Sequence, residues 1–224
     1  MAVSINTYGG LSSAVLAWLA RTGDATLTAR FDDFLALCER RMYYGYATEN
    51  PADPMSSDPL RIPEMETVNT SFTLDTTGTV AQPSGFLEVI SAYSTTLNAP
   101  MELVSQKIID GYGASSVGGT KMLAVSGSNF RYLDIPSASQ NITLRYYAKL
   151  TTPTASTANS ILTNYPDVYL YGCLTEAAIY TQATEEATKY VALYNASVSG
   201  LNARTQRITA SATPVIRLRR GMVP

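Results

Sequence analysis

Histidine is absent from this chain of 224 residues. Because histidine is the commonest general base near neutral pH and the commonest metal ligand, its absence excludes Ser–His and Cys–His nucleophile systems. The two cysteines, Cys38 and Cys173, are too few to form a zinc site alone, and both fall on apolar helix faces. We expect them to be buried free thiols, and we predict no catalytic residue, metal site or cofactor.

Charged side chains and long apolar runs are also scarce. Charged residues make up 15% of the chain, against about 25% in a typical globular protein. No run approaches the ~20 apolar residues of a membrane span and no signal-peptide pattern opens the sequence, so we expect no membrane partner. Polarity comes instead from Ser, Thr, Asn and 15 tyrosines. Tyrosine suits surfaces that become buried against partners, so the composition favours an assembling protein.

The charges that are present are unevenly distributed. Residues 1–186 contain ten Lys/Arg and eighteen Asp/Glu, a net charge of −8. Residues 187–224 contain six Lys/Arg and no acid, a net charge of +6. This asymmetry predicts head-to-tail contacts between unlike surfaces, or a tail that faces nucleic acid. The alternative is a short basic tail that is merely solvated.

Helical periodicity marks the beginning of the chain. Thr7 is expected to cap a first helix, and a second is predicted from Leu27 to Tyr44, with a stop at Gly45. The inner faces of these two helices comprise Leu11, Ala14, Val15, Trp18 and Leu19, then Leu27, Phe31, Phe34, Leu35, Cys38 and Met42. The charged residues expected to lie mostly on the solvated side are Asp32, Asp33, Glu39, Arg40 and Arg41.

A second helical pair, from Leu162 to Arg207, is the most informative stretch of the sequence. Pro166 fits a first helical turn, where its missing N–H costs nothing, and Thr184 restarts the helix as a capping residue. The apolar positions are Leu170, Cys173, Leu174, Ala177, Ala178 and Thr181, then Ala187, Tyr190, Val191, Tyr194, Val198 and Leu201. The last dozen residues alternate apolar and basic, a pattern that could add a strand to a neighbour's sheet edge.

A proline-rich connection from Thr48 to Pro63 and a run of period-two segments separate the helical pairs. Strands are predicted at residues 68–74, 87–93, 101–103, 121–125, 130–135 and 141–150. Segregated runs of this kind indicate an α+β fold. We expect the N- and C-terminal helices to form one bundle, with an inserted, mostly antiparallel β domain and an extended C-terminal arm. The predicted divisions are 1–62 (helices and link), 63–150 (β domain), 151–208 (helical hairpin) and 209–224 (basic arm).

Two other patterns point to chemistry only weakly. Paired carboxylates serve glycosidases, but Glu64, Glu66 and Asp134 are scattered with no supporting motif. Aromatic and basic residues alternate in Arg145–Lys149 and could stack on single-stranded nucleic acid. Strand alternation explains the same segment more simply, with Tyr146 inward and its neighbours outward.

Several segments, taken in their order and spacing, resemble one family. The most similar element is Leu162–Gly172 running into Thr175–Ala178. Further similar segments are Thr7–Leu11, Trp18–Thr22, Arg30–Phe34, Glu39–Arg41, Pro100–Ser105 and Leu144–Leu150. Gln82–Glu88 is similar to a Leu-Pro-x-Asp-Phe-Leu-Glu strand opening, although Gln82 and Gly85 replace the leucine and the aspartate. Together these segments resemble the head-to-tail adaptor (connector or neck) proteins of short-tailed and related bacteriophages.

The resemblance implies a non-enzymatic structural virion protein of the neck or tail region, assembled in the host cell cytoplasm. Members of this family form a homo-oligomeric ring, typically a dodecamer, that docks on the portal protein and offers a platform for tail or nozzle proteins. Double-stranded DNA passes through the ring's channel without specific recognition. The alternative is another ring-forming tail component, such as a stopper or nozzle-proximal protein. A nucleic-acid-binding module would need more positive charge than this chain carries.

Two sets of contact residues are predicted. Those expected to contact the portal or a neighbouring subunit are Ile216, Arg217, Leu218, Arg219 and Arg220. Those expected to build the ring wall or touch adjacent subunits are Tyr165, Tyr169, Tyr171, Arg204 and Arg207. Because Tyr169 and Tyr171 diverge by about 200° around a helix, we expect one to pack inside and the other to face a subunit contact.

Overall fold

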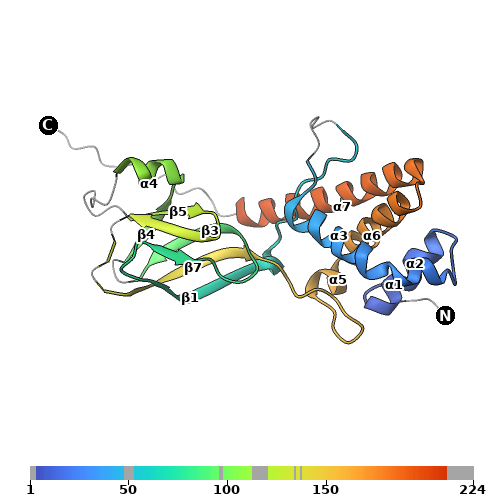
Figure 1. The fold of residues 1–224 in the computed structure, drawn as a ribbon, viewed down its shortest axis with the longest axis horizontal. Helices are drawn as coiled ribbons and strands as arrows, with labels where there is room; N and C mark the ends of the chain where they lie inside the picture. Colours follow the sequence, from blue (N-terminus) through green and yellow to red (C-terminus); the bar gives the residue numbers. More distant parts are fainter. Residues whose placement is uncertain are drawn as a thin grey trace. The chain divides into compact units, whose positions relative to one another are not determined.

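The computed structural model describes residues 4–47, 53–95, 98–112, 121–133, 135–136 and 138–210. The chain divides into two compact units, Met1–Pro63 with Pro153–Pro224, and Glu64–Thr152. We name the first the helical unit and the second the β unit, after the elements that each contains (Figure 1). Because the helices and the sheet are segregated along the chain, the predicted α+β class is confirmed.

The described part of the helical unit contains six α-helices. They are α1 (Tyr8–Trp18), α2 (Ala25–Ala29), α3 (Phe31–Tyr44), α5 (Ser160–Asn164), α6 (Pro166–Tyr180) and α7 (Thr184–Ala210). Capping residues explain where three of these helices begin. The Thr7 and Asp24 side chains accept hydrogen bonds from backbone N–H groups in the first turns of α1 and α2, and Pro166 is the first residue of α6. The single helix predicted from Leu27 to Tyr44 is wrong at Arg30, where the chain breaks between α2 and α3.

Helix α6 lies at the centre of this unit, in contact with α1, α3, α5 and α7. Gly172 permits the close approach of α6 to α3 and α7, because a Cβ atom there would overlap Cys38 Sγ on α3 and lie 3.4 Å from Tyr194 Cε2 on α7. Cys38 and Cys173 are both free and buried, as predicted. A hydrogen bond with Cys38, together with burial, raises the pKa of the Cys173 thiol well above its ordinary value, so this thiol stays protonated.

Four residues differ from the predicted helix faces, two on the inner faces and two on the solvated side of α3. Trp18 is 52% exposed and Thr181 is exposed, because each lies at the end of its helix, beyond the packed turns. Glu39 and Arg41 were expected on the solvated side of α3 but are buried. Each has a polar partner that makes burial tolerable: Tyr169 for Glu39, and Glu176 for Arg41.

The described part of the proline-rich connection, residues 53–62, is irregular, as predicted, and is bonded to the helices. Leu60 and Ile62 are buried. Two asparagines of α7 hold its backbone: Asn202 accepts from Arg61 N at 2.8 Å and donates to Pro59 O at 3.0 Å, while Asn195 donates to Ser56 O at 2.7 Å. Side-chain amides supply these bonds because the prolines leave no regular backbone ladder.

The described residues of the β unit form one seven-stranded sheet in the order β1-β7-β3-β4-β5-β6-β2. Its elements are β1 (Glu66–Leu74), β2 (Thr79–Ala81), β3 (Phe86–Ser94), β4 (Ala99–Leu103), α4 (Gln106–Tyr112), β5 (Met122–Ser126), β6 (Asn129–Leu133) and β7 (Gln140–Ala148), after a 3-10 turn at Pro63–Met65. The strand pairs are antiparallel except β4 with β5. The sheet curls around an aromatic core, in which the Phe130 ring lies edge-on to Phe72 and Phe86.

Two features of the β unit differ from the sequence pattern. β2 is too short to show alternation, so it was not predicted. In β1 the register shifts between Asn69 and Phe72, and this bulge leaves Val68 49% exposed although Phe72 and Leu74 point inward. Tyr146 is buried and Arg145 is exposed, as the alternation in β7 predicted. Asp134 lies outside the described residues.

Candidate functional site

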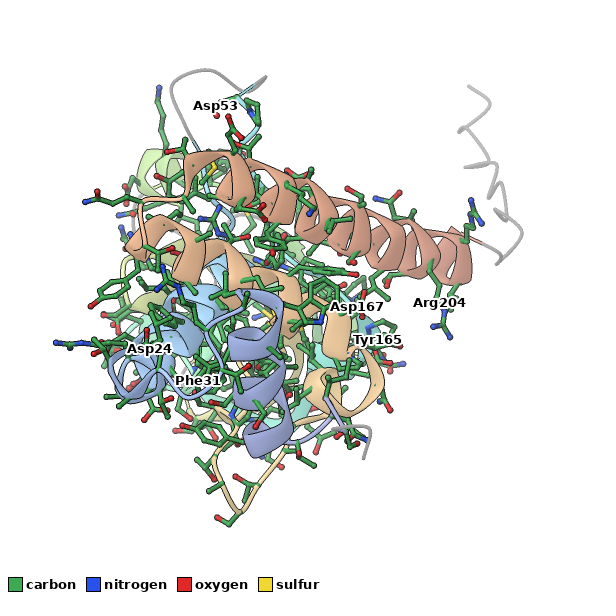
Figure 2. The ribbon with its side chains drawn as sticks, turned by 90° about the vertical axis from the view of Figure 1, so that its right-hand side faces the viewer. Asp24, Phe31, Asp53, Tyr165, Asp167 and Arg204 are labelled. Atoms are coloured by element: carbon green, nitrogen blue, oxygen red, sulfur yellow. The ribbon has the colours of Figure 1, made fainter. Side chains whose placement is uncertain are left out.

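The predicted wall residues come from both ends of the α6–α7 hairpin. Tyr165 precedes α6, and Arg204 lies near the end of α7; Arg204 Nη1 donates to Tyr165 Oη at 3.5 Å. Figure 2 shows Arg204 projecting from α7 on the side where Tyr165 and Asp167 lie. Arg207 is exposed one turn further along. The structure therefore brings Tyr165 and Arg204 together on one surface, with basic charge supplied by α7.

Tyr169 is the inward member of the tyrosine pair on α6. Its hydroxyl donates to Glu39 Oε1 at 2.9 Å and accepts from Asn159 Nδ2 at 2.7 Å, and its side chain is fully buried. Burial, followed by the nearby Glu39 charge, raises the pKa of Tyr169 far above its ordinary value. This residue ties α3, α5 and α6 together and is out of reach of another subunit.

Tyr171 is half-buried, and its ring packs edge-on against Trp18 with 6.0 Å between ring centroids. Trp18 is itself half-exposed, so the pair presents aromatic surface where α1 meets α6. An exposed aromatic pair of this kind is typical of surfaces that become buried on association. Of the two tyrosines, only Tyr171 retains surface for such a contact.

A buried ion pair missed by sequence reasoning joins α3 to α6. Arg41 donates to Glu176 Oε1 from Nη2 at 2.8 Å and from Nε at 3.0 Å, and it donates to Met55 O at 3.1 Å. The Arg41 guanidinium also lies 4.6 Å from the ring centroid of Tyr46. The Arg41 guanidinium is therefore engaged through Nε, Nη1, Nη2 and its planar face. No sequence signal separates Arg41 from its exposed neighbour Arg40.

The outer face of α3 and the end of α6 carry exposed apolar side chains. They are Leu37, Tyr44, Tyr46, Ile179 and Tyr180, which are 44–59% exposed. A groove of about 210 Å³ is lined by two of them, Leu37 and Tyr46, together with Arg40 and other residues. We name these five residues the apolar face. Exposed apolar clusters on soluble proteins commonly mark contacts with other proteins.

The basic end of the chain is only partly described. Helix α7 carries Lys189, Arg204 and Arg207 and no acid after Glu186. The predicted contact residues Ile216, Arg217, Leu218, Arg219 and Arg220 lie outside the described residues. Within the part of the chain that the structure describes, no three acidic, histidine or cysteine side chains gather as metal ligands. No helix there combines the length and apolar character needed to cross a membrane.

Comparison with known proteins gives one family match. A family model described as SU10 adaptor protein matches residues 6–218 and so spans both compact units. The curated proteins include no match to the chain.

Proposed function

The chain belongs to the SU10 adaptor protein family, a family of phage head-to-tail adaptors, and from this premise we propose that it forms the ring that joins portal to tail. A protein of this family is a structural component of the virion. The observation that carries the proposal is the extent of the match, from residue 6 to residue 218, because it includes the helices, the sheet and most of the basic end.

The proposed ring is a homo-oligomer, twelve-fold as in the resembled family. Rings arise from heterologous contacts, in which one face of a subunit binds a different face of the next. The apolar face on α3 and α6 offers one such surface, and Tyr171 with Trp18 offers another. The charge division between residues 1–186 and 187–224 also provides unlike surfaces for this purpose.

In this proposal the divisions of the chain have separate roles. The N-terminal helices (1–62) and the hairpin (151–208) form one bundle that builds the ring wall. The β domain (63–150) is inserted between them. Tyr165, Tyr171, Arg204 and Arg207 are the proposed subunit contacts, and Tyr169 supports the wall from within.

The basic arm (209–224) is the proposed clasp, reaching the portal or the neighbouring adaptor. Its contact residues are Ile216, Arg217, Leu218, Arg219 and Arg220. DNA would pass through the channel, and a net-acidic body suits that role because strong phosphate binding would hinder sliding. Tail or nozzle proteins would bind the ring on its other side.

Removal of residues 209–224 tests the clasp. We expect the shortened chain to keep its helical circular dichroism spectrum and to lose binding to the purified portal of the same phage. Full-length protein is the positive control. Undiminished portal binding by the shortened chain at moderate salt would contradict the role of the arm. Binding of the full chain to a tail tube, with none to the portal, would favour the stopper or nozzle-proximal alternative.

A further inference from the structure

The outer side of α3 carries a straight row of four side chains. Asp33, Leu37, Arg40 and Tyr44 follow one another by four, three and four residues, so they lie along one stripe of the helix. All four are exposed in the described structure. We name these four residues the α3 row. The same spacing of four and three residues is the one with which two helices pack side by side.

The α3 row carries opposite charges on either side of its middle. Asp33 is in the first turn of α3, where it pairs with Arg30 on the surface. Arg40 lies two turns further along and has no hydrogen-bond or ionic partner among the described residues. The middle is apolar, because Leu37 lies beside the exposed Ala36. The row therefore runs from an acid through apolar side chains to a base.

Aromatic side chains widen the row at both ends. At the first turn of α3, the Tyr180 ring lies 5.6 Å from the Phe34 ring, measured between centroids. At the other end, Tyr46 lines one groove with Arg40, and Tyr44 is the last residue of the helix. These three tyrosines are each about half exposed. Each end of the row thus combines one charge with the kind of aromatic surface that is enriched in protein interfaces.

A surface with this arrangement is complementary to itself. Asp33 and Arg40 lie equally far along α3 from the point midway between Ala36 and Leu37. If two copies of α3 pack antiparallel about a two-fold axis at that point, Asp33 of each copy faces Arg40 of the other. Leu37 of each copy then lies over the small side chain of Ala36, which lets the helices approach closely. The aromatic groups at opposite ends of the row also meet.

We propose that a second copy of the chain covers the apolar face of the free protein, by antiparallel packing of α3 on α3. This contact is isologous, because it pairs one face with itself, whereas a ring needs heterologous contacts between two different faces. A single helix row lies at the low end of interface sizes, so the dimer is weak, with a dissociation constant on the order of 10–100 μM.

The dimer has a consequence that rests on the proposed function. The apolar face is one of the surfaces proposed to contact the next subunit of the ring, and the dimer covers it. A paired copy therefore cannot enter a ring until its partner leaves. The dimer keeps free subunits from assembling away from the portal, and portal binding must compete with it.

Reversal of the charges in the row tests the pairing. In sedimentation equilibrium of the full chain at low salt, we expect the unmodified protein to form dimers. Asp33→Arg or Arg40→Glu alone should raise the dimer dissociation constant at least about tenfold, because each replaces two attractive contacts by two repulsive ones. Arg145→Glu, at an exposed position of β7, is the matched control and should leave the constant unchanged.

Restored complementarity separates this dimer from other modes of association. The chain with both Asp33→Arg and Arg40→Glu should dimerise like the unmodified protein, and a mixture of the two single variants should form mixed dimers. An unmodified chain that is monomeric at millimolar concentration would overturn the proposal. So would a doubly substituted chain that associates as weakly as the single variants while its circular dichroism spectrum is unchanged.

A single introduced cysteine tests the two-fold geometry. Ala36→Cys places one thiol of each copy beside the axis, whereas head-to-tail packing would set position 36 against a different residue. Oxidised glutathione should convert this variant to a disulfide-linked dimer, as the two thiols are oxidised and one glutathione disulfide is reduced to two glutathione molecules. The native Cys38 and Cys173 are buried and should not react. Linkage no greater than that of an Arg145→Cys control would overturn the proposal.

The linked dimer then tests the consequence for assembly. Mixed with the purified portal of the same phage, the disulfide-linked Ala36→Cys dimer should add no ring, and reduction should restore ring formation. A linked dimer that adds a ring as readily as the reduced variant would overturn the blocking role. Failure of the unmodified protein to bind the portal would instead count against the proposed function and leave the dimer standing.

Discussion

At the scale of single residues, the packing of α6 against its neighbours depends on one glycine. Gly172 lies on α6 between Cys38 of α3 and Tyr194 of α7, and no side chain fits there without displacing one of them. Helical spacing predicted the buried faces around Gly172 well, because each apolar position repeats every three or four residues. The need for glycine at that position was not predictable, since it depends on the distance between helices.

Gly172→Ala should destabilise the protein by about 2 kcal/mol, the usual cost of overpacking a core. Urea unfolding followed by circular dichroism measures this change. Gly200→Ala is the matched control: nothing lies within 4 Å of the added Cβ, so alanine should stabilise α7 by about 0.5–1 kcal/mol. Adding Cys38→Ala to Gly172→Ala should reduce the overpacking cost. Equal, small effects of the two glycine substitutions would contradict this packing.

Two non-glycine residues adopt left-handed backbone where α1 and α6 end. Ala20 has φ 53° and Gln182 has φ 59°. Each is followed by a capping bond, from Arg21 N to Leu16 O and from Ala183 N to Ala178 O, both 2.9 Å long. A left-handed conformation costs about 1–2 kcal/mol for residues other than glycine, so glycine is preferred at these caps.

Ala20→Gly should therefore raise the free energy of unfolding by about 1 kcal/mol, because glycine adopts this conformation without strain. The same exchange at Ala192, an exposed position within α7, should lower stability by about 1 kcal/mol. Thermal or urea unfolding of both variants gives the comparison. If both exchanges destabilise equally, the turn after α1 does not have this geometry.

At the scale of elements, polar groups as well as apolar faces hold α3, α6 and the connection together. The Arg41–Glu176 pair has side-chain exposures of 4% and 11%, whereas the Arg30–Asp33 pair on the surface has 58% and 61%. The types and order of most elements followed from periodicity, whereas β2 and the break between α2 and α3 did not. The buried partners did not, because a charge on an amphipathic helix is normally solvated and its burial depends on a residue distant in sequence.

Removing one partner of the buried pair is predicted to be costly. Glu176→Ala leaves the Arg41 charge buried and should destabilise the protein by about 3–5 kcal/mol. Asp33→Ala in the exposed pair should cost less than about 1 kcal/mol. Replacing both members of the buried pair by apolar residues, as in Arg41→Met with Glu176→Leu, should recover much of the loss. Similar small losses in both single variants would contradict the burial described for Arg41.

At the scale of the whole molecule, the two compact units share one chain in which the helical unit is assembled from both ends. The predicted α+β class and the family follow from segment order, and the family match over residues 6–218 confirms the resemblance. The contact residues were harder to predict, because whether a tyrosine is buried or free for a partner depends on its position around the helix. Tyr169 and Tyr171 differ by two positions, yet one is enclosed and the other is half-exposed.

Electron microscopy of this protein mixed with the purified portal of the same phage tests the central claim most directly. The account predicts an additional ring at one end of the portal, with one adaptor chain per portal subunit and an open central channel. Portal particles that remain bare while the protein stays folded and in excess would contradict the claim that it is the ring joining head to tail.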